Sequence, residues 1–243
     1  MLDKLELNSK LPQVSTSIFA VMSKMANDYG AINLSQGFPD FNCSDQLVEL
    51  VHHFIRKGFN QYAPMPGTVE LRKQIMQKVK RDYGRDYNFE KEITVTAGAT
   101  QALYTAFSSI IIKNDEVLIF EPAYDSYIPA IVANGGIPVS IKLNANDFSI
   151  PWEEVEKSIT KKTKCIVINS PHNPTGAILK QEDILQLEKI VKDTNIFLIS
   201  DEVYEHIIFD NQEHYSFARY DELAKRGFII SSFGKTFHTT GWK

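Results

Sequence analysis

The sequence contains little cysteine, no excess of positive charge and no long apolar segment. Its two cysteines, Cys43 and Cys165, are far apart and lack metal-ligand spacing, which argues against a disulfide framework or a metal site and fits a reducing cytosol. With 26 basic and 30 acidic residues the net charge is −4, so a nucleic-acid partner is not expected. The apolar runs at 110–112 and 117–120 are far too short to cross a membrane. We therefore expect a soluble, cytoplasmic protein with no membrane partner.

Glycine-rich phosphate motifs are absent as well. Neither G-x-G-x-x-G nor G-x-x-x-x-G-K-[ST] occurs, so the usual fingerprints of dinucleotide and nucleoside triphosphate sites are missing. Hydrophobic residues make up 43% of the chain and charged residues 23%, which is typical of a globular protein and unlike a disordered or low-complexity segment.

Short apolar runs alternate with helical patterns along most of the chain. Such runs are typical of strands that are covered on both faces. The alternation predicts an α/β fold with a mostly parallel sheet and helices on both faces. The expected strands are 93–97, 116–120, 137–141, 164–169, 196–200 and 228–232, and the expected helices lie near 18–29, 67–83, 99–112, 124–134, 151–161 and 181–194.

The two ends of the sequence differ from this alternating region. Residues 1–45 are expected to form an N-terminal arm and the start of a loop region, and residues 46–243 a large domain. The chain stops shortly after its last expected strand, with no closing helix. We expect the large domain to be incomplete at its C-terminal end.

Polar or small residues follow several of the expected strands, where parallel sheets bind their ligands. Residues 97–101 read AGATQ and open a helix. Small residues there let a phosphate approach backbone N–H groups, and a helix N-terminus favours an anion. Small residues also open many helices for reasons of packing alone.

Three further strand ends carry residues that could take part in catalysis or ligand binding. Residues 170–176 (SPHNPTG) are either a plain proline turn or a rigid turn that presents Asn173. Asp201, in the string DEVY, is either a helix N-cap or a ligand-facing carboxylate. Lys235, between apolar residues, either extends to water or is a desolvated and therefore nucleophilic amine. Together with Tyr204 these residues match the needs of pyridoxal 5′-phosphate, which requires an anion site, a lysine, a carboxylate for its ring nitrogen and donors for its ring oxygen.

Two longer strings resemble one protein family. Residues 232–243 (SFGKTFHTTGWK) resemble the lysine motif of the class I/II aminotransferases of fold type I. Residues 33–41 (NLSQGFPDF) and 60–62 (NQY) are similar to the branch that contains kynurenine/glutamine transaminases and bacterial methionine aminotransferases. The resemblance covers about residues 10–243, and it implies that 46–243 is the large domain that binds pyridoxal 5′-phosphate.

The resemblance implies a role for each matching residue. Lys235 would form the Schiff base and move the proton, Asp201 would pair with the pyridine nitrogen, and Tyr204 would act beside them. The other implied cofactor contacts are Gly98, Ala99, Thr100, Tyr124, Asn173, Ser232 and Lys243, with Tyr62 reaching in from a second subunit of a homodimer that shares its active sites. The implied substrate contacts are Gly37, Phe19 and Asn173.

One part of the family's pattern is not in this sequence. The C-terminal small domain and its arginine, which grips the substrate α-carboxylate, would follow Lys243. The six arginines outside the motifs lie in expected surface helices or loops, so none is expected to replace it: Arg56, Arg72, Arg81, Arg85, Arg219 and Arg226. For that reason the 243-residue chain itself is expected to have little activity.

The resemblance implies an aminotransferase that moves the amino group of an apolar, thioether or aromatic amino acid, methionine-like above all, to a 2-oxo acid. A kynurenine/glutamine-type transaminase with cysteine-conjugate β-lyase activity is an alternative, as is an inactive cofactor-binding fragment. A non-catalytic phosphate- or nucleotide-binding module is a further alternative, but it would have no use for Lys235, Asp201 and Tyr204 together.

Overall fold

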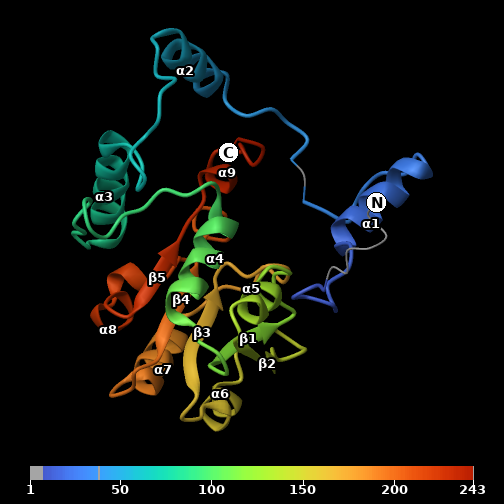
Figure 1. Ribbon diagram of the computed structural model, residues 1–243, viewed down its shortest axis with the longest axis vertical. Coiled ribbons are helices and arrows are strands. Elements are labelled where there is room, and N and C mark those ends of the chain that lie inside the picture. The colour runs from blue at the N-terminus through green and yellow to red at the C-terminus, as the bar shows by residue number, and fades with distance from the viewer. Residues whose placement is uncertain (1–7, 38, 243) are drawn as a thin grey trace. The chain divides into compact units, whose positions relative to one another are not determined.

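The structure is a computed structural model that describes residues 8–37 and 39–242 (Figure 1). The chain divides into two compact units, one within residues 1–42 and one from Cys43 onward. The division into an arm at 1–45 and a large domain at 46–243 stays a prediction about the family's domains.

The first unit contains the helix α1 (Ile18–Asp28), as the pattern near 18–29 predicts. Ser17 precedes it in an extended conformation, and its hydroxyl accepts a hydrogen bond from the N–H of Ala20 at 3.3 Å, as an N-cap does. Asn33 donates to the hydroxyl of Ser23 at 3.1 Å, which ties the following loop back to the helix.

The second unit is built on a parallel sheet of five strands in the order β2-β1-β3-β4-β5. Every pair of neighbours is parallel. The central strands are apolar almost throughout, which explains why five of the six expected strands are confirmed. Their bounds are β1 (Glu116–Glu121), β2 (Ile137–Lys142), β3 (Thr163–Asn169), β4 (Phe197–Asp201) and β5 (Gly227–Ile230).

The sixth expected strand is wrong. Residues 93–97 form no strand; the N–H of Val95 donates instead to the carbonyl of Pro66 at 2.9 Å, in the loop that precedes a helix. The alternation of Ile93 and Val95 with threonines satisfies β-propensity, but propensity does not supply a neighbouring strand.

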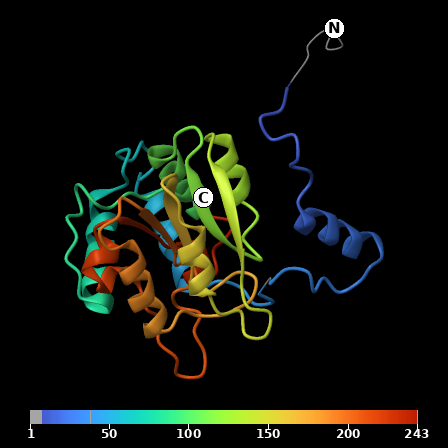
Figure 2. The same ribbon diagram turned by 90° about the horizontal axis from the view of Figure 1, so that it is seen from below.

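Two apolar cores cover the two faces of the sheet, so the predicted helices on both faces are confirmed. One core joins the sheet to α6, α7 and α8 through residues such as Val155, Leu187 and Leu223. The other joins it to α4 and α5 through residues such as Phe107 and Ile131. Figure 2 shows the helices of these two sets on opposite sides of the strands.

All six expected helices are present, and each is shorter than predicted. The helices of the second unit are α2 (Asp45–Arg56), α3 (Val69–Tyr83), α4 (Ala99–Ile110), α5 (Tyr127–Ala133), α6 (Trp152–Ser158), α7 (Gln181–Val191), η2 (Phe217–Arg219), α8 (Asp221–Ala224) and α9 (Phe233–Thr236). The sequence pattern does not predict α2, α8, α9 or η2. Within the described residues no helix combines the length and the apolar character needed to span a bilayer.

Candidate active site

A buried carboxylate lies at the carboxyl end of the sheet. Asp201 ends β4 beside Asn169, which ends β3, and only 3% of Asp201 is exposed. Tyr127, from α5, donates its hydroxyl to Asp201 Oδ2 at 2.6 Å, and the N–H of Val203 donates to Oδ1 at 3.4 Å. Burial raises the pKa of Asp201 to about 6, although these hydrogen bonds act in the opposite direction. The fold therefore holds the pKa of this carboxyl group above its usual value.

Asn173, Tyr204 and Lys235 lie close to one another at this edge. Asn173 Nδ2 donates to the hydroxyl of Tyr204 at 3.5 Å, and Lys235 Nζ lies over the Tyr204 ring, 5.4 Å from its centre. The structure thus brings the amide, the phenol and the amine together, with the Asp201 carboxylate three residues before Tyr204.

Lys235 is exposed, because it sits in the short helix α9, which buries no residue. The assignment of Lys235 as a nucleophilic amine stays a prediction.

The segment 97–101 forms a second part of the site. Gly98 precedes α4 with φ +87°, a conformation that other residues adopt only with strain, and it leads directly into Ala99 and Thr100. Thr100 Oγ1 lies 3.3 Å from the hydroxyl of Tyr124, whose ring packs edge-on against Tyr127 at 5.6 Å. The helix N-terminus and Tyr124 are thus linked to the residue that holds Asp201. Ser232, the other described residue expected at a phosphate, is the N-cap residue of α9.

The remaining expected contacts are placed less completely. Tyr62 lies in the second unit and is fully exposed, as a residue that serves another subunit would be. Gly37 and Phe19 belong to the first unit, where Phe19 is a half-buried residue of α1. Lys243 lies outside the described residues.

Two side chains at this edge are not among the residues predicted from the sequence. Tyr127 bonds to Asp201, which is 74 residues away, and Asn169 donates to the backbone carbonyl of Asp201 at 2.8 Å across 32 residues. Tyr127 follows Tyr124 by three residues and begins α5, and Asn169 ends an apolar strand. These positions are the only sequence signals that could have found them.

Glu205, the residue after Tyr204, is the buried carboxylate of an ion pair with Lys78. The carboxylate of Glu205, 5% exposed, accepts hydrogen bonds from the Lys78 ammonium and the Tyr83 hydroxyl of α3, and from the Ser231 hydroxyl at 2.8 Å. Burial acts to raise the pKa of Glu205, but the bonds from Lys78, Tyr83 and Ser231 outweigh it and hold that pKa below its usual value. Glu205 thus joins α3 to the loop that carries Tyr204 and to the chain before Ser232.

The expectation that all six arginines lie in surface helices or loops is wrong for Arg72. Arg72 is buried, and it donates to the carbonyls of Gly67 at 3.1 Å and Phe89 at 2.9 Å. Helix α3 carries many charged residues, so its sequence does not indicate that the guanidinium of Arg72 faces inward. Because Arg72 is buried and donates to two backbone carbonyls, it has a structural role.

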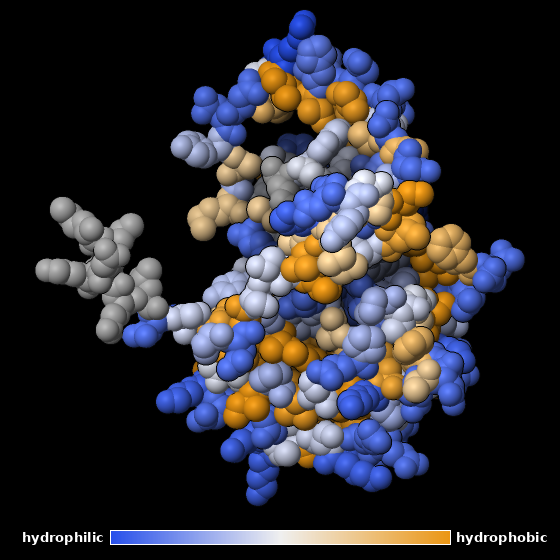
Figure 3. Space-filling view, turned by 90° about the vertical axis from the view of Figure 1, so that its right-hand side faces the viewer, coloured by the Kyte–Doolittle hydropathy of each residue, from blue (hydrophilic) through white to orange (hydrophobic). Residues whose placement is uncertain are grey.

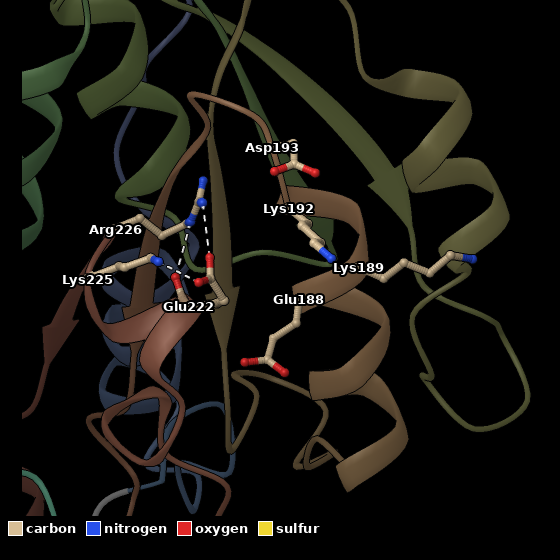
Figure 4. Close-up of a pocket in the computed structure, with 7 residues that line it drawn as sticks. All are labelled: Glu188, Lys189, Lys192, Asp193, Glu222, Lys225 and Arg226. Atoms are coloured by element: carbon tan, nitrogen blue, oxygen red, sulfur yellow. Dashed lines mark hydrogen bonds and ion pairs between the residues drawn. The ribbon is translucent and has the colours of Figure 1, made fainter.

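A groove with a charged lining lies away from this edge. It has a volume of about 550 Å³ between α7 and the chain before β5, and Figure 4 shows its charged lining: Glu188, Lys189, Lys192, Asp193, Glu222, Lys225 and Arg226. Arg226 donates to the carbonyls of Thr194 at 2.9 Å and Ile196 at 3.3 Å, just before β4 begins. The groove therefore opens at the amino end of the strands, opposite Asp201.

Comparisons with known proteins agree with this arrangement. Residues 29–243 match the family model "Aminotransferase class I and II". The chain is 46% identical over 235 residues to methionine aminotransferase of Escherichia coli, covering 97% of this chain and 61% of that protein. It is 39% identical over 237 residues to a probable N-succinyldiaminopimelate aminotransferase of Mycobacterium tuberculosis, covering 97% of this chain and 60% of that protein.

Solved structures give the same result. The crystal structure of YbdL from Escherichia coli matches with a TM-score of 0.94 and 45% identity over 98% of this chain. The structure and reactivity of YbdL identify a methionine aminotransferase function for that protein. The N-succinyldiaminopimelate aminotransferase structure from Mycobacterium tuberculosis matches with a TM-score of 0.93. The chain spans 62% of the length of each of these two structures. The chain belongs to the class I and II aminotransferase family.

Proposed function

We propose that this chain supplies the cofactor-binding part of an aminotransferase that acts on methionine-like amino acids, with Lys235 as the residue that carries the cofactor. One observation supports it above all others: a buried carboxylate, an amide, a phenol and an amine lie at the same end of a parallel sheet. The family to which the chain belongs depends on pyridoxal 5′-phosphate.

The residues present fit that cofactor. Asp201 offers a negative charge out of water, which favours a protonated ring nitrogen beside it. Asn173 and Tyr204 offer donors to a ring oxygen, and the ring of Tyr124 offers an apolar surface. The N-terminus of α4, after Gly98, would present the N–H groups of Ala99 and Thr100 to a phosphate, with Ser232 as a further contact. Lys243, also expected at the phosphate, lies outside the described residues.

When bound, pyridoxal 5′-phosphate supplies an aldehyde that exchanges amino groups and a ring that draws electrons from the bond being broken. Lys235 Nζ would accept the proton from the substrate Cα and return it, as a general base and acid. The Asp201 carboxylate is held in position, because the Tyr127 hydroxyl donates a hydrogen bond to its Oδ2 at 2.6 Å. Asn173 orients Tyr204 through their mutual hydrogen bond.

Replacing Lys235 with alanine should abolish covalent capture of the cofactor. Incubation with pyridoxal 5′-phosphate and then borohydride should add a reduced pyridoxyl group to Lys235 of the wild-type chain, because only an amine can form the bond that borohydride fixes. Mass spectrometry of the digested protein locates the group. Lys225→Ala, which removes a surface lysine away from the site, is the matched control. A pyridoxyl group on another lysine of the wild type would contradict the assignment.

We also propose that the protein works as a homodimer in the cytoplasm, with Tyr62 reaching the cofactor phosphate of the partner subunit. Tyr62 is fully exposed, and α2, just before it, buries no residue although Val48, Val51 and Phe54 are large and apolar. Figure 3 shows apolar side chains at the top of the molecule, over α2. Contiguous apolar surface of this kind is typical of an interface.

Donor selectivity follows from the aromatic residues of the proposed site. The resemblance to the family implies aromatic contacts to the amino donor from Phe19, Tyr62 and Tyr124, and a contact near its carboxylate from the loop that contains Gly37. A buried unpaired charge is costly beside aromatic side chains. We expect methionine, phenylalanine, tyrosine and glutamine to react faster than aspartate, as measured by 2-oxo acid release from a panel of donors at equal concentration. A strong preference for aspartate over all four would overturn the proposed substrate class.

A further inference from the structure

One side-chain amide joins the two residues proposed to hold opposite functions of the cofactor ring. Asn169 ends β3, and its side chain bonds in two directions. Its Nδ2 donates to the backbone carbonyl of Asp201 at 2.8 Å, and its Oδ1 accepts the N–H of Asn173 at 2.7 Å. The side chain therefore bridges the end of β4 and the turn that carries Asn173.

The turn and the strand end are otherwise held by different contacts. The N–H of His172 donates to the carbonyl of Ala177 at 2.8 Å, and the N–H of Gly176 donates to the carbonyl of His172 at 2.8 Å, so these bonds fix the turn within itself. The N–H of Ser170 donates to the same Asp201 carbonyl at 3.1 Å, at the start of the turn. The bond from Asn173 to Asn169 is the one that sets the far side of the turn against the sheet.

We propose that Asn169 is a positioning residue that sets the spacing between the Asn173 amide and the Asp201 carboxylate. This inference rests on the proposed function, in which Asn173 donates to the ring oxygen and Asp201 pairs with the ring nitrogen. In pyridoxal 5′-phosphate a single ring carbon separates the nitrogen from the carbon that bears this oxygen, so both groups must meet one side of the ring at once. A rigid link between them satisfies that requirement, because a side chain held at both ends has little freedom to lose on binding.

Removing this link should change two properties of the bound cofactor: the pH midpoint of its absorption change and its affinity for the protein. A hydrogen bond to the ring oxygen stabilises negative charge there and so lowers the proton affinity of the adjoining nitrogen that links the cofactor to lysine. Asn169→Ala should therefore raise the pH midpoint of the bound cofactor's visible absorption change by roughly half to one unit. It should weaken binding of pyridoxal 5′-phosphate about three- to tenfold, as expected for one misplaced hydrogen bond.

The experiment compares Asn169→Ala, Asn173→Ala and the double variant with the wild-type protein. Because Asn169 acts through Asn173, each single variant should shift the midpoint, and the double variant should shift it no further than Asn173→Ala alone. Asn88→Ala is the matched control, since Asn88 Oδ1 also accepts backbone N–H groups, from Glu90 at 2.9 Å and Lys91 at 3.2 Å, outside the site. Asn169→Ser, whose side chain is too short to bridge, replaces the alanine variant if that variant does not fold.

The outcomes separate the inference from the function on which it rests. A lower melting temperature for Asn169→Ala with the wild-type midpoint and affinity would show a merely structural role and overturn the inference. Additive midpoint shifts in the double variant would also overturn it. If the wild-type chain forms no borohydride-fixed adduct at Lys235, the proposed function itself fails.

Discussion

Replacing Asp201 with asparagine should stabilise the cofactor-free protein at pH 8, and in a full-length enzyme that contains this chain it should remove most of the turnover. Burial raises the pKa of this carboxyl to about 6, whereas an aspartate in an unfolded chain has a pKa near ~3.9. The folded state therefore binds the proton more tightly. The stability linked to this proton is fully present below about pH 4 and is lost as the pH rises through 6. Asparagine has the same shape and no proton to lose.

The expected gain at pH 8 is about 1–3 kcal/mol, and it should vanish near pH 4. Urea unfolding of the cofactor-free wild type and variant at these two pH values measures it. Tyr127→Phe provides a control of opposite sign: loss of the hydroxyl bond at 2.6 Å should raise the pKa of Asp201 further and lower stability at pH 8. An asparagine variant that is less stable than wild type at pH 8 would show that the carboxylate is not held against the folded state.

The loss of turnover follows from the same charge. A carboxylate fixed beside the ring nitrogen favours its protonated form, and removing one fixed electrostatic partner of this kind costs about 10²- to 10³-fold in rate. The increase in melting temperature on adding pyridoxal 5′-phosphate should also be smaller for the variant than for the wild type, because binding no longer relieves an unfavourable charge. Turnover close to that of the wild type would remove Asp201 from the mechanism.

The Lys78→Met variant should lose about 3–5 kcal/mol of stability, because it leaves Glu205 buried without its cation. The pKa of Glu205 is held below its usual value, so the stability that this carboxylate contributes is present at neutral pH and is lost as the pH falls through that pKa. The difference between variant and wild type should accordingly shrink on acidification, when Glu205 of the variant takes up a proton. Chemical unfolding at pH 7 and pH 5 measures both quantities.

Lys80 on the same helix provides the matched control. It pairs with Asp86 at 2.6 Å, but both side chains are more than half exposed, so Lys80→Met should change the free energy of unfolding by less than about 1 kcal/mol. The double variant Lys78→Met/Glu205→Met, which removes both charges, should lose less than Lys78→Met alone. Equal losses for Lys78→Met and Lys80→Met would mean that Glu205 reaches water.

The strands could be predicted from the sequence because they are continuous apolar runs buried on both faces. Residues 93–97 have the same local character, but no neighbouring strand pairs with them, and pairing is not a local property. The helix α2 is not predicted, because it stands apart from the strand–helix alternation. Burial alone does not decide which helices the sequence predicts: α1 buries no residue and is predicted, whereas the four-residue helix α8 buries Leu223 and Ala224 and is too short to show a helical period.

The chemistry of the site could be predicted as a set of residue types at strand ends, and Asp201, Asn173 and Tyr204 do lie at one edge. The supporting residues could not be predicted. Tyr127 and Asn169 act through hydrogen bonds that span 74 and 32 residues, and no spacing in the sequence encodes such bonds. The exposure of Lys235 was also beyond reach, because apolar neighbours in sequence do not ensure apolar neighbours in space.

The parallel sheet has a consequence for how the chain reaches its folded state. Neighbouring strands in the sheet are never antiparallel, so no hairpin can start it. Two neighbouring strands can pair only after the crossover segment between them, such as the one from Asn169 to Phe197, has closed a long loop. Non-local pairing of this kind slows folding to milliseconds or longer. Unpaired strand edges are exposed during that time and can pair between chains. Refolding yield should therefore depend on protein concentration more steeply than the stability of the finished sheet would suggest.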